Sequence, residues 1–139
     1  MVDERTEALK RVPAAAHTEI AALCNAAWPD EACGLVIDGA VLPSANVASG
    51  PREQRFRLGG PQALAMERAL RSGADVVLWH SHTVASAGSD LSADDIAAAA
   101  PFGEPLHRTL IHMVVDARSG RARGWRAFAW DRAAFVRLT

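Results

Sequence analysis

The segment DVVLWHSH, residues 75–82, is the stretch from which the rest of the chain is best interpreted. It is a continuous apolar run with β-branched residues, which is typical of a buried central strand. His80 and His82 stand at its end, one residue apart. Because side chains on a strand repeat with a period of two, both imidazoles would project from the same face. The segment therefore predicts a strand that ends in a pair of metal ligands.

A candidate third ligand follows in LSADD, residues 91–95. Ser92 is a typical N-cap, which places Asp94 and Asp95 in the first turn of a short helix. The helix dipole alone favours acidic residues there, so capping is the simplest interpretation of both aspartates. Two imidazoles and one carboxylate nevertheless suit a zinc ion that keeps one position open for water. Asp95 is our first choice for that carboxylate.

The overall composition predicts one compact domain. The chain has 139 residues, half of them hydrophobic, which is enough for a substantial core. A net charge of -1, from 15 basic and 16 acidic residues, creates no overall field that would attract nucleic acid or an anionic membrane. We therefore expect neither as a partner.

The terminal sequence and the cysteines bear on the cellular compartment. The apolar runs are too short to cross a bilayer, and the acidic start of the chain lacks the features of a secretory signal. We therefore expect a cytoplasmic protein. Cys24 and Cys33 have no metal-binding spacing, and in a reducing compartment we expect two unpaired, buried thiols.

The remaining segments predict an α/β protein of the α+β type. Residues 1–12 are charged without clear periodicity, which predicts a loose N-terminal arm before a domain over residues 13–139. Within the domain we expect a helix from Pro13 to about Trp28, a β-hairpin over 31–42, a loop over 43–60 with a short strand at 56–58, a helix over 61–71, a hairpin formed by 110–116 and 123–130, and a short helix or strand over 131–138.

Two further residues complete a hydrolytic site. Hydrolysis at a metal needs a general base that takes a proton from water and passes it to the leaving amine, and a carboxylate does this in many enzymes. Glu31, at the start of the predicted hairpin, is the natural candidate, although a lone Glu there is usually only a solvated strand end. Ser92 lies one helical turn before Asp95 and could stabilise an oxyanion in the same pocket.

Other polar residues have weaker claims. Asn46 and Arg55 are candidates for lining a site because they lie in the predicted loop over a fold edge. His17 is best interpreted as a surface or capping histidine and His112 as a packed strand histidine. His107 precedes the strand at 110–116 and could approach the site, but it has no partner in the sequence.

Taken together, these residues resemble the JAMM motif of JAB/MPN-domain zinc metalloproteases. The resemblance rests on Glu31 within PDEACGLV (residues 29–36), on His80 and His82, and on the Ser92-x-x-Asp95 pattern. Within that family the sequence is most similar to the compact bacterial and phage-tail-associated JAB proteins. Their Glu-Ala-Cys-Gly strand, an Asn after the hairpin and a Phe-x-Leu segment have counterparts here at residues 31–34, 46 and 56–58.

The resemblance extends from about Pro13 to the end of the chain. It implies a single cytidine-deaminase-like JAB/MPN domain with a curved mixed β-sheet flanked by helices. It also implies Zn2+ bound by His80, His82 and Asp95, with Glu31 as general base and Ser92 as oxyanion stabiliser. The family cleaves peptide or isopeptide bonds, in several members after the C-terminal glycine of ubiquitin or a ubiquitin-like protein. The expected substrate is thus a peptide or a ubiquitin-like protein.

The sequence departs from the family pattern at two points. Thr83 replaces the usual proline after the second histidine, and nine residues, 83–91, precede Ser92 where the family more often has seven. We interpret this as a two-residue insertion in the loop, which leaves Asp90 and Asp94 as lesser candidates for the third ligand.

Two alternatives have distinct sequence signatures. A non-catalytic JAB/MPN scaffold, or a module that binds a ubiquitin-like protein, would lack metal ligands, and here no ligand is missing. A zinc nucleoside deaminase would need a His-x-Glu and a Pro-Cys-x-x-Cys motif, and the sequence contains neither.

Overall fold

The computed structural model describes the backbone of residues 2–84 and 88–139 and the side chains from residue 4 onward within those ranges. The elements there are α1 (Val2–Lys10), α2 (Ala14–Ala27), β1 (Cys33–Ile37), β2 (Ala40–Ser44), α3 (Gly60–Arg71), β3 (Val76–His82), α4 (Ala93–Ala99), β4 (Ile111–Asp116), the 3-10 turn η1 (Arg118–Gly120), β5 (Gly124–Asp131) and β6 (Ala134–Arg137).

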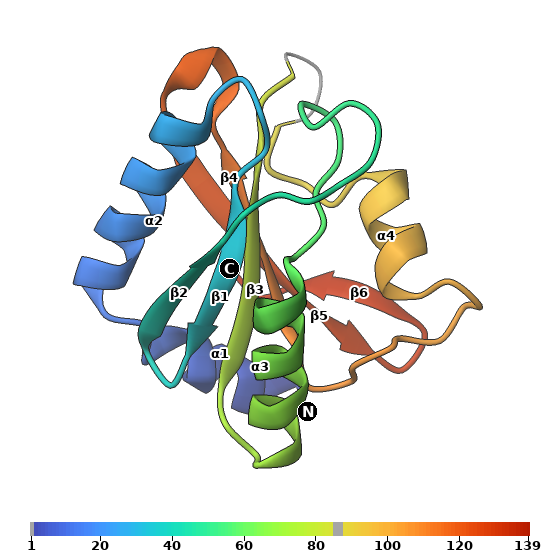
Figure 1. Ribbon diagram of the computed structural model, residues 1–139. Helices are drawn as coiled ribbons and strands as arrows, with labels where there is room; N and C mark the ends of the chain where they lie inside the picture. Colours follow the sequence, from blue (N-terminus) through green and yellow to red (C-terminus); the bar gives the residue numbers. More distant parts are fainter. Residues whose placement is uncertain (1, 85–87) are drawn as a thin grey trace.

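The strands form one mixed sheet in the order β2-β1-β3-β4-β5-β6 (Figure 1). Strands β3 and β4 run parallel, and the other neighbouring pairs are antiparallel. A parallel pair needs a crossover, and the segment that contains α4 provides it. Helix α4 therefore begins just beyond the end of β3 that carries the two histidines.

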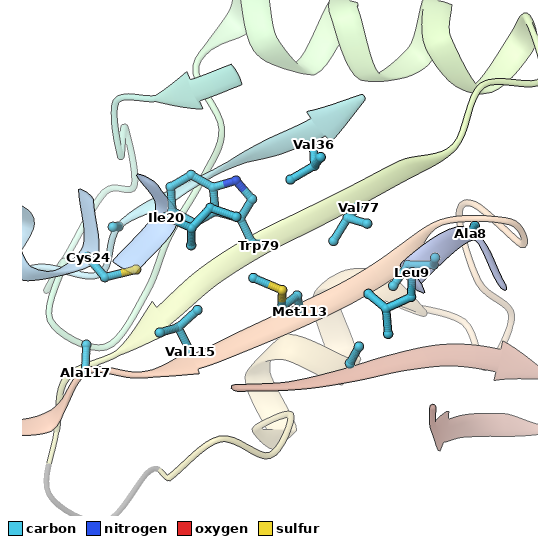
Figure 2. Packing of buried hydrophobic residues seen from close by; sticks show 13 residues of the cluster. Ala8, Leu9, Ile20, Cys24, Val36, Val77, Trp79, Met113, Val115 and Ala117 are labelled. Atoms are coloured by element: carbon cyan, nitrogen blue, oxygen red, sulfur yellow. The ribbon is translucent and has the colours of Figure 1, made fainter. Parts of the chain in front are cut away.

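One face of the sheet packs against α1 and α2 and contains the main core. Trp79, Met113 and Ala127 are paired across β3, β4 and β5 and are fully buried. Figure 2 shows Trp79 beside Ile20 of α2. A Cβ atom on Gly34 would lie 2.5 Å from the Trp79 ring, so the close approach of β1 to this indole requires glycine.

The opposite face packs against α3 and carries the functional residues. Leu35, Val76 and Leu110 form a second cluster there with Met66 of α3. The period-two alternation of β3 continues from Val76 and Leu78 on this face to His80 and His82. Strand β3 thus places Trp79 on one side of the sheet and two buried imidazoles on the other.

Most of the predicted elements are confirmed. The first helix, both hairpins, the helix over 61–71 and the buried strand lie where the sequence predicts them. The terminal segment forms a strand, β6, and Cys24 and Cys33 are free and buried. None of the helices in the described residues has the length and apolar character needed to cross a membrane.

Two predictions were wrong. Residues Val2–Lys10 form α1 rather than a loose arm, because Ala8 and Leu9 bury one side of this short helix in the main core. Arg11, just after the helix, also pairs with Asp75 at 2.8 Å. Residues 56–58 form no strand and contribute only an isolated bridge between Leu58 and Asn46.

Candidate metal centre and active site

The end of β3 places both histidines beside the segment that precedes β1. Each imidazole is only 3% exposed. Ser81, between them, points to the other face, where its hydroxyl accepts the N–H of Ala32 at 2.8 Å. The Ser81 N–H in turn donates to the Ala32 carbonyl at 3.0 Å. This reciprocal pair fixes the residue after Glu31 against the strand that carries the histidines.

Three ligand atoms converge at this point. His80 Nε2 and His82 Nε2 are 3.1 Å apart, and Asp95 Oδ2 lies 3.2 Å from the first and 3.0 Å from the second. Within the described residues, these three side chains make up the one group of His, Cys, Asp or Glu that could hold a metal ion. The prediction that Asp95 joins the two histidines is confirmed at the level of geometry.

The start of α4 fixes the third member of the group. Ser92 is the N-cap: its hydroxyl accepts the Asp95 N–H at 3.0 Å, and Asp95 Oδ2 accepts the Ser92 N–H at 2.9 Å. The two residues thus form a reciprocal capping box. Asp95 is therefore both a helix cap and a candidate ligand, and the two roles use the same oxygen.

The shape of the group suits zinc. Ligands at about 2.0–2.1 Å around a tetrahedral ion are separated by roughly 3.3 Å. The observed separations of 3.0–3.2 Å between the three ligand atoms are close to that spacing. Two imidazole nitrogens and one carboxylate oxygen are also a donor set that catalytic zinc accepts, with one position left for water or substrate.

The surroundings orient each imidazole. The carbonyl of Gly88 lies 3.2 Å from His82 Nδ1, so a proton on Nδ1 can be donated to it while Nε2 keeps its lone pair for a metal. Phe56 stacks on His80 with ring centroids 4.3 Å apart and an angle of 18° between the planes. Nothing in the sequence pattern of either loop predicts these two contacts.

Charge and burial act differently on the three side chains of the group. Burial lowers the pKa of His80, although the nearby Asp95 acts in the opposite direction. Burial acts to raise the pKa of Asp95, but the hydrogen bonds and charges of His80 and His82 outweigh it and hold that pKa well below its usual range. Burial also acts to lower the pKa of His82, but the hydrogen bond and charge of Asp95 outweigh it, so that pKa is raised. A cation that binds at the group therefore competes with a proton on His82.

Glu31 lies next to this group. Its side chain is 4% exposed, and its Oε1 atom is buried without a hydrogen-bond partner. Burial raises the pKa of Glu31 to about 8, while the charge of His82 lowers it and that of Asp95 raises it. These interactions with two members of the triad indicate that the Glu31 carboxylate lies close to the group.

Asn46 holds the backbone around Glu31. Its amide nitrogen donates to the carbonyls of Glu31 and Arg55, at 3.0 and 2.8 Å. Its oxygen accepts the N–H groups of Ala48 and Arg57, both at 3.1 Å. All four bonds are used within the chain, so Asn46 supports the site through the backbone and has no remaining group to offer a ligand.

The family follows from a comparison with known proteins. A family model that describes prokaryotic homologs of the JAB domain matches residues 13–131. The chain belongs to this prokaryotic JAB family. A comparison of this JAB domain with curated proteins gave no match.

Two solution structures are similar to the JAB domain in fold. Protein DSY2949 from Desulfitobacterium hafniense is 22% identical, with a TM-score of 0.61 over 87% of this chain and 84% of that chain. A protein from Salinibacter ruber is also 22% identical, with a TM-score of 0.54 over 90% of this chain and 85% of that chain. These likenesses support the single α+β JAB-like domain with its mixed sheet.

The other candidate ligands of the JAB domain do not belong to the triad. Asp90 is paired with Arg126 at 2.6 Å. Asp94 lines an adjacent groove but does not belong to the triad. Residues 85–87 of the predicted loop over 83–91 lie outside the described residues, so the two-residue insertion stays a prediction.

Three histidines lie outside the metal centre of the JAB domain. His17 stacks on Trp125 with ring centroids 4.7 Å apart, so it is a packed residue rather than a capping group. His107 lies 3.3 Å from Glu67 of α3. His112 is buried and packs edge-on against Phe135, as expected for a strand histidine.

Thr83 has a structural role at the position where the family usually has proline. Its hydroxyl lies 2.8 Å from the carbonyl of Pro29 and 3.1 Å from that of Glu53. A hydroxyl can donate only one proton, so Thr83 bonds either to Pro29, before Glu31, or to Glu53, in the loop over 43–60, at any one time. The departure from the family pattern therefore ties the end of β3 to the chain that carries Glu31.

A groove of about 670 Å³ opens beside the metal centre of the JAB domain. Its lining residues come mainly from α3, α4, β3 and β4 and from the loop before α3. Its lining is largely apolar and reaches the metal centre at His80 and Asp95, and Arg55 contributes to it as the sequence predicts. The apolar part is formed chiefly by Phe56, Leu58, Met66, Leu78, Leu91 and Leu110.

Proposed function

We propose that this JAB domain is a zinc-dependent peptidase or isopeptidase in which Glu31 is the general base and Ser92 stabilises the oxyanion. One observation carries the proposal. Three ligand atoms lie within 3.2 Å of one another, next to a buried carboxylate oxygen that has no hydrogen-bond partner. An unpaired buried polar atom is costly and calls for an explanation, and a catalytic role suits a carboxylate oxygen beside three ligand atoms.

His80, His82 and Asp95 would hold the ion. A bound zinc would supply a Lewis acid that polarises a carbonyl and lowers the pKa of water. The three residues come from the end of β3 and the start of α4. They would supply three protein ligands, and a tetrahedral zinc would then have one position left for water or substrate.

Glu31 moves the proton. A cation at the triad favours the ionised carboxylate and so offsets the burial that raises the pKa of Glu31 to about 8 without metal. Its unpartnered Oε1 accepts a proton from the attacking water and then delivers it to the leaving amine nitrogen. The backbone hydrogen bonds from Glu31 to Arg52 and Asn46 hold the main chain that carries this carboxylate.

Ser92 provides a hydrogen-bond donor. Its Oγ accepts the N–H of Asp95 in the capping box, which occupies one lone pair and leaves the hydroxyl proton available. That proton can be donated to the oxygen that becomes negative when the carbonyl is attacked. The capping role and the catalytic role are therefore compatible, because they use different parts of the hydroxyl.

The groove supports an extended peptide as substrate. Ligand sites in proteins are typically concave and largely apolar with a few convergent polar groups, and this groove ends at the metal centre in the same way. An open, largely apolar groove can accept an extended tail along its length. We propose the C-terminal tail of a ubiquitin-like protein, joined through a peptide or isopeptide bond, as the first substrate class to test.

A hydrolysis panel tests the proposed function. Zinc-loaded protein is incubated with ubiquitin-like fusions and with extended peptides, with and without a chelator. We expect cleavage of at least one ubiquitin-like fusion that stops when zinc is removed and resumes when zinc is restored. Stoichiometric zinc without cleavage of any panel member would instead favour a non-catalytic binding module.

A further inference from the structure

Helix α4 carries Asp95, the proposed third ligand, but is not packed into the hydrophobic core. None of its seven residues is buried. A helix of two turns without a buried face is only weakly stable on its own, because helical stability in proteins comes mainly from packing. The position of Asp95 must therefore depend on the segment that leads into α4.

That segment, residues 88–92, contacts the metal centre twice. The Gly88 carbonyl lies 3.2 Å from His82 Nδ1, and Ser92 shares the capping box with Asp95. Between these two contacts, Asp90 Oδ1 accepts a hydrogen bond of 2.6 Å from Arg126 Nη1. A displacement of the segment would therefore disturb one histidine and the carboxylate together.

Arg126 is well placed to hold this segment. It lies on β5 opposite Val114 of β4, which in turn lies opposite His80 of β3. The three residues therefore share one row on the face of the sheet that carries the site. The strand is fixed by neighbours on both sides, so Arg126 connects a rigid element to the loop.

We propose that Arg126 is a positioning residue of the metal centre. Through Asp90 it holds residues 88–92, and this keeps the Gly88 carbonyl on His82 and the capping box beneath Asp95. The inference rests on the proposed metal site but not on peptide hydrolysis. It also gives a role to Asp90, the aspartate that a strict seven-residue loop would have placed where Ser92 stands.

Zinc affinity tests the proposal, because a positioning role and a purely electrostatic role of Arg126 predict opposite changes in affinity when Arg126 is replaced. Arg126→Met keeps the aliphatic stem and removes the charge. If Arg126 acted only through its field, its loss would strengthen binding of a cation, because a positive charge near the site would be gone. If it positions the site, its loss should weaken zinc binding by about three- to fivefold, as expected for a lost ion pair of this exposure.

A double-mutant cycle distinguishes positioning through the Arg126–Asp90 pair from an effect of the Arg126 charge alone. Zinc affinity is measured by competition with a chromogenic chelator for Arg126→Met, Asp90→Asn and the double variant, with Arg137→Met on β6 as control. Positioning predicts similar losses in both single variants, no further loss in the double variant and no change in the control. The melting temperature of metal-depleted protein should be the same in all of them.

Two outcomes would overturn the proposal. They are tighter zinc binding by Arg126→Met, and losses that add in the double variant. Neither outcome would affect the proposed function, which needs wild-type protein to bind zinc through His80, His82 and Asp95 and to hydrolyse a substrate. Conversely, wild-type protein without stoichiometric zinc would overturn both.

Discussion

Asp95 Oδ2 lies 3.0 Å from His82 Nε2 and at the same time accepts the N–H of Ser92 at 2.9 Å. The carboxylate that completes the triad is thus held by the first turn of the helix that it caps. This arrangement explains how an aspartate on a helix with no buried residue can still approach two buried histidines. It also means that changes in the cap and changes in metal binding should be coupled.

The ligand assignment predicts different effects at neighbouring aspartates. Asp95→Asn should lower zinc affinity by more than about 100-fold, since loss of a ligand should exceed the roughly 10–100-fold loss seen for outer-shell partners. Asp94→Asn, one residue away, should leave the stoichiometry at one zinc per chain. Elemental analysis of both proteins after dialysis against trace chelator checks this. Equal zinc loss in the two variants would contradict the assignment.

The two roles of Ser92 can be separated by substitution. Ser92→Gly removes the hydroxyl but costs only a few tenths of a kcal/mol as an N-cap. It should therefore lower kcat by about 100- to 1000-fold, the range for a lost oxyanion donor, with little change in the free energy of unfolding. Ser92→Thr keeps a hydroxyl and should retain most activity. Similar kcat values for wild type and Ser92→Gly would remove Ser92 from the mechanism.

His112 predicts a pH dependence of stability. Burial, aided by the charges of His80 and His107, lowers the pKa of His112 to about 4, whereas the unfolded chain titrates near 6.5. The unfolded state therefore binds a proton that the folded state excludes, so stability falls as the pH decreases from 6.5 toward 4. The shift corresponds to about 3 kcal/mol at the acid end of this window.

The variant His112→Phe isolates this contribution. Phenylalanine keeps a ring against Phe135 but does not titrate. Urea denaturation of metal-depleted protein at pH 7 and pH 4.5 should show a smaller loss of unfolding free energy in the variant than in wild type. Parallel losses in the two proteins would mean that His112 does not titrate as described.

Local sequence patterns predicted much of the site because its candidate metal ligands lie in two short segments, each with a recognisable strand or helix-cap pattern. The period of two in β3 places His80 and His82 on one face whatever the rest of the chain does. The Ser-x-x-Asp pattern predicts a capping box, and the box turns Asp95 rather than Asp94 toward the histidines. Choosing among the aspartates still needed the three-dimensional position of α4.

Contacts between loops could not be predicted in this way. The stacking of Phe56 on His80 and the contact of Gly88 with His82 join segments that have no periodic pattern. The arrangement around Glu31 depends on Asn46, whose four hydrogen bonds appear only when the loop is folded. The helix α1 was missed because its buried side comprises little more than Ala8 and Leu9.

The central claim is that Glu31 moves a proton at a metal held by other residues, and the variant Glu31→Gln tests it most directly. Zinc content and hydrolysis of a cleaved substrate are measured on the same sample of wild type and variant. We predict one zinc per chain in both proteins and a rate about 100- to 10,000-fold lower in the variant, since the amide cannot accept the proton. Undiminished hydrolysis by a variant that keeps its zinc would contradict the account.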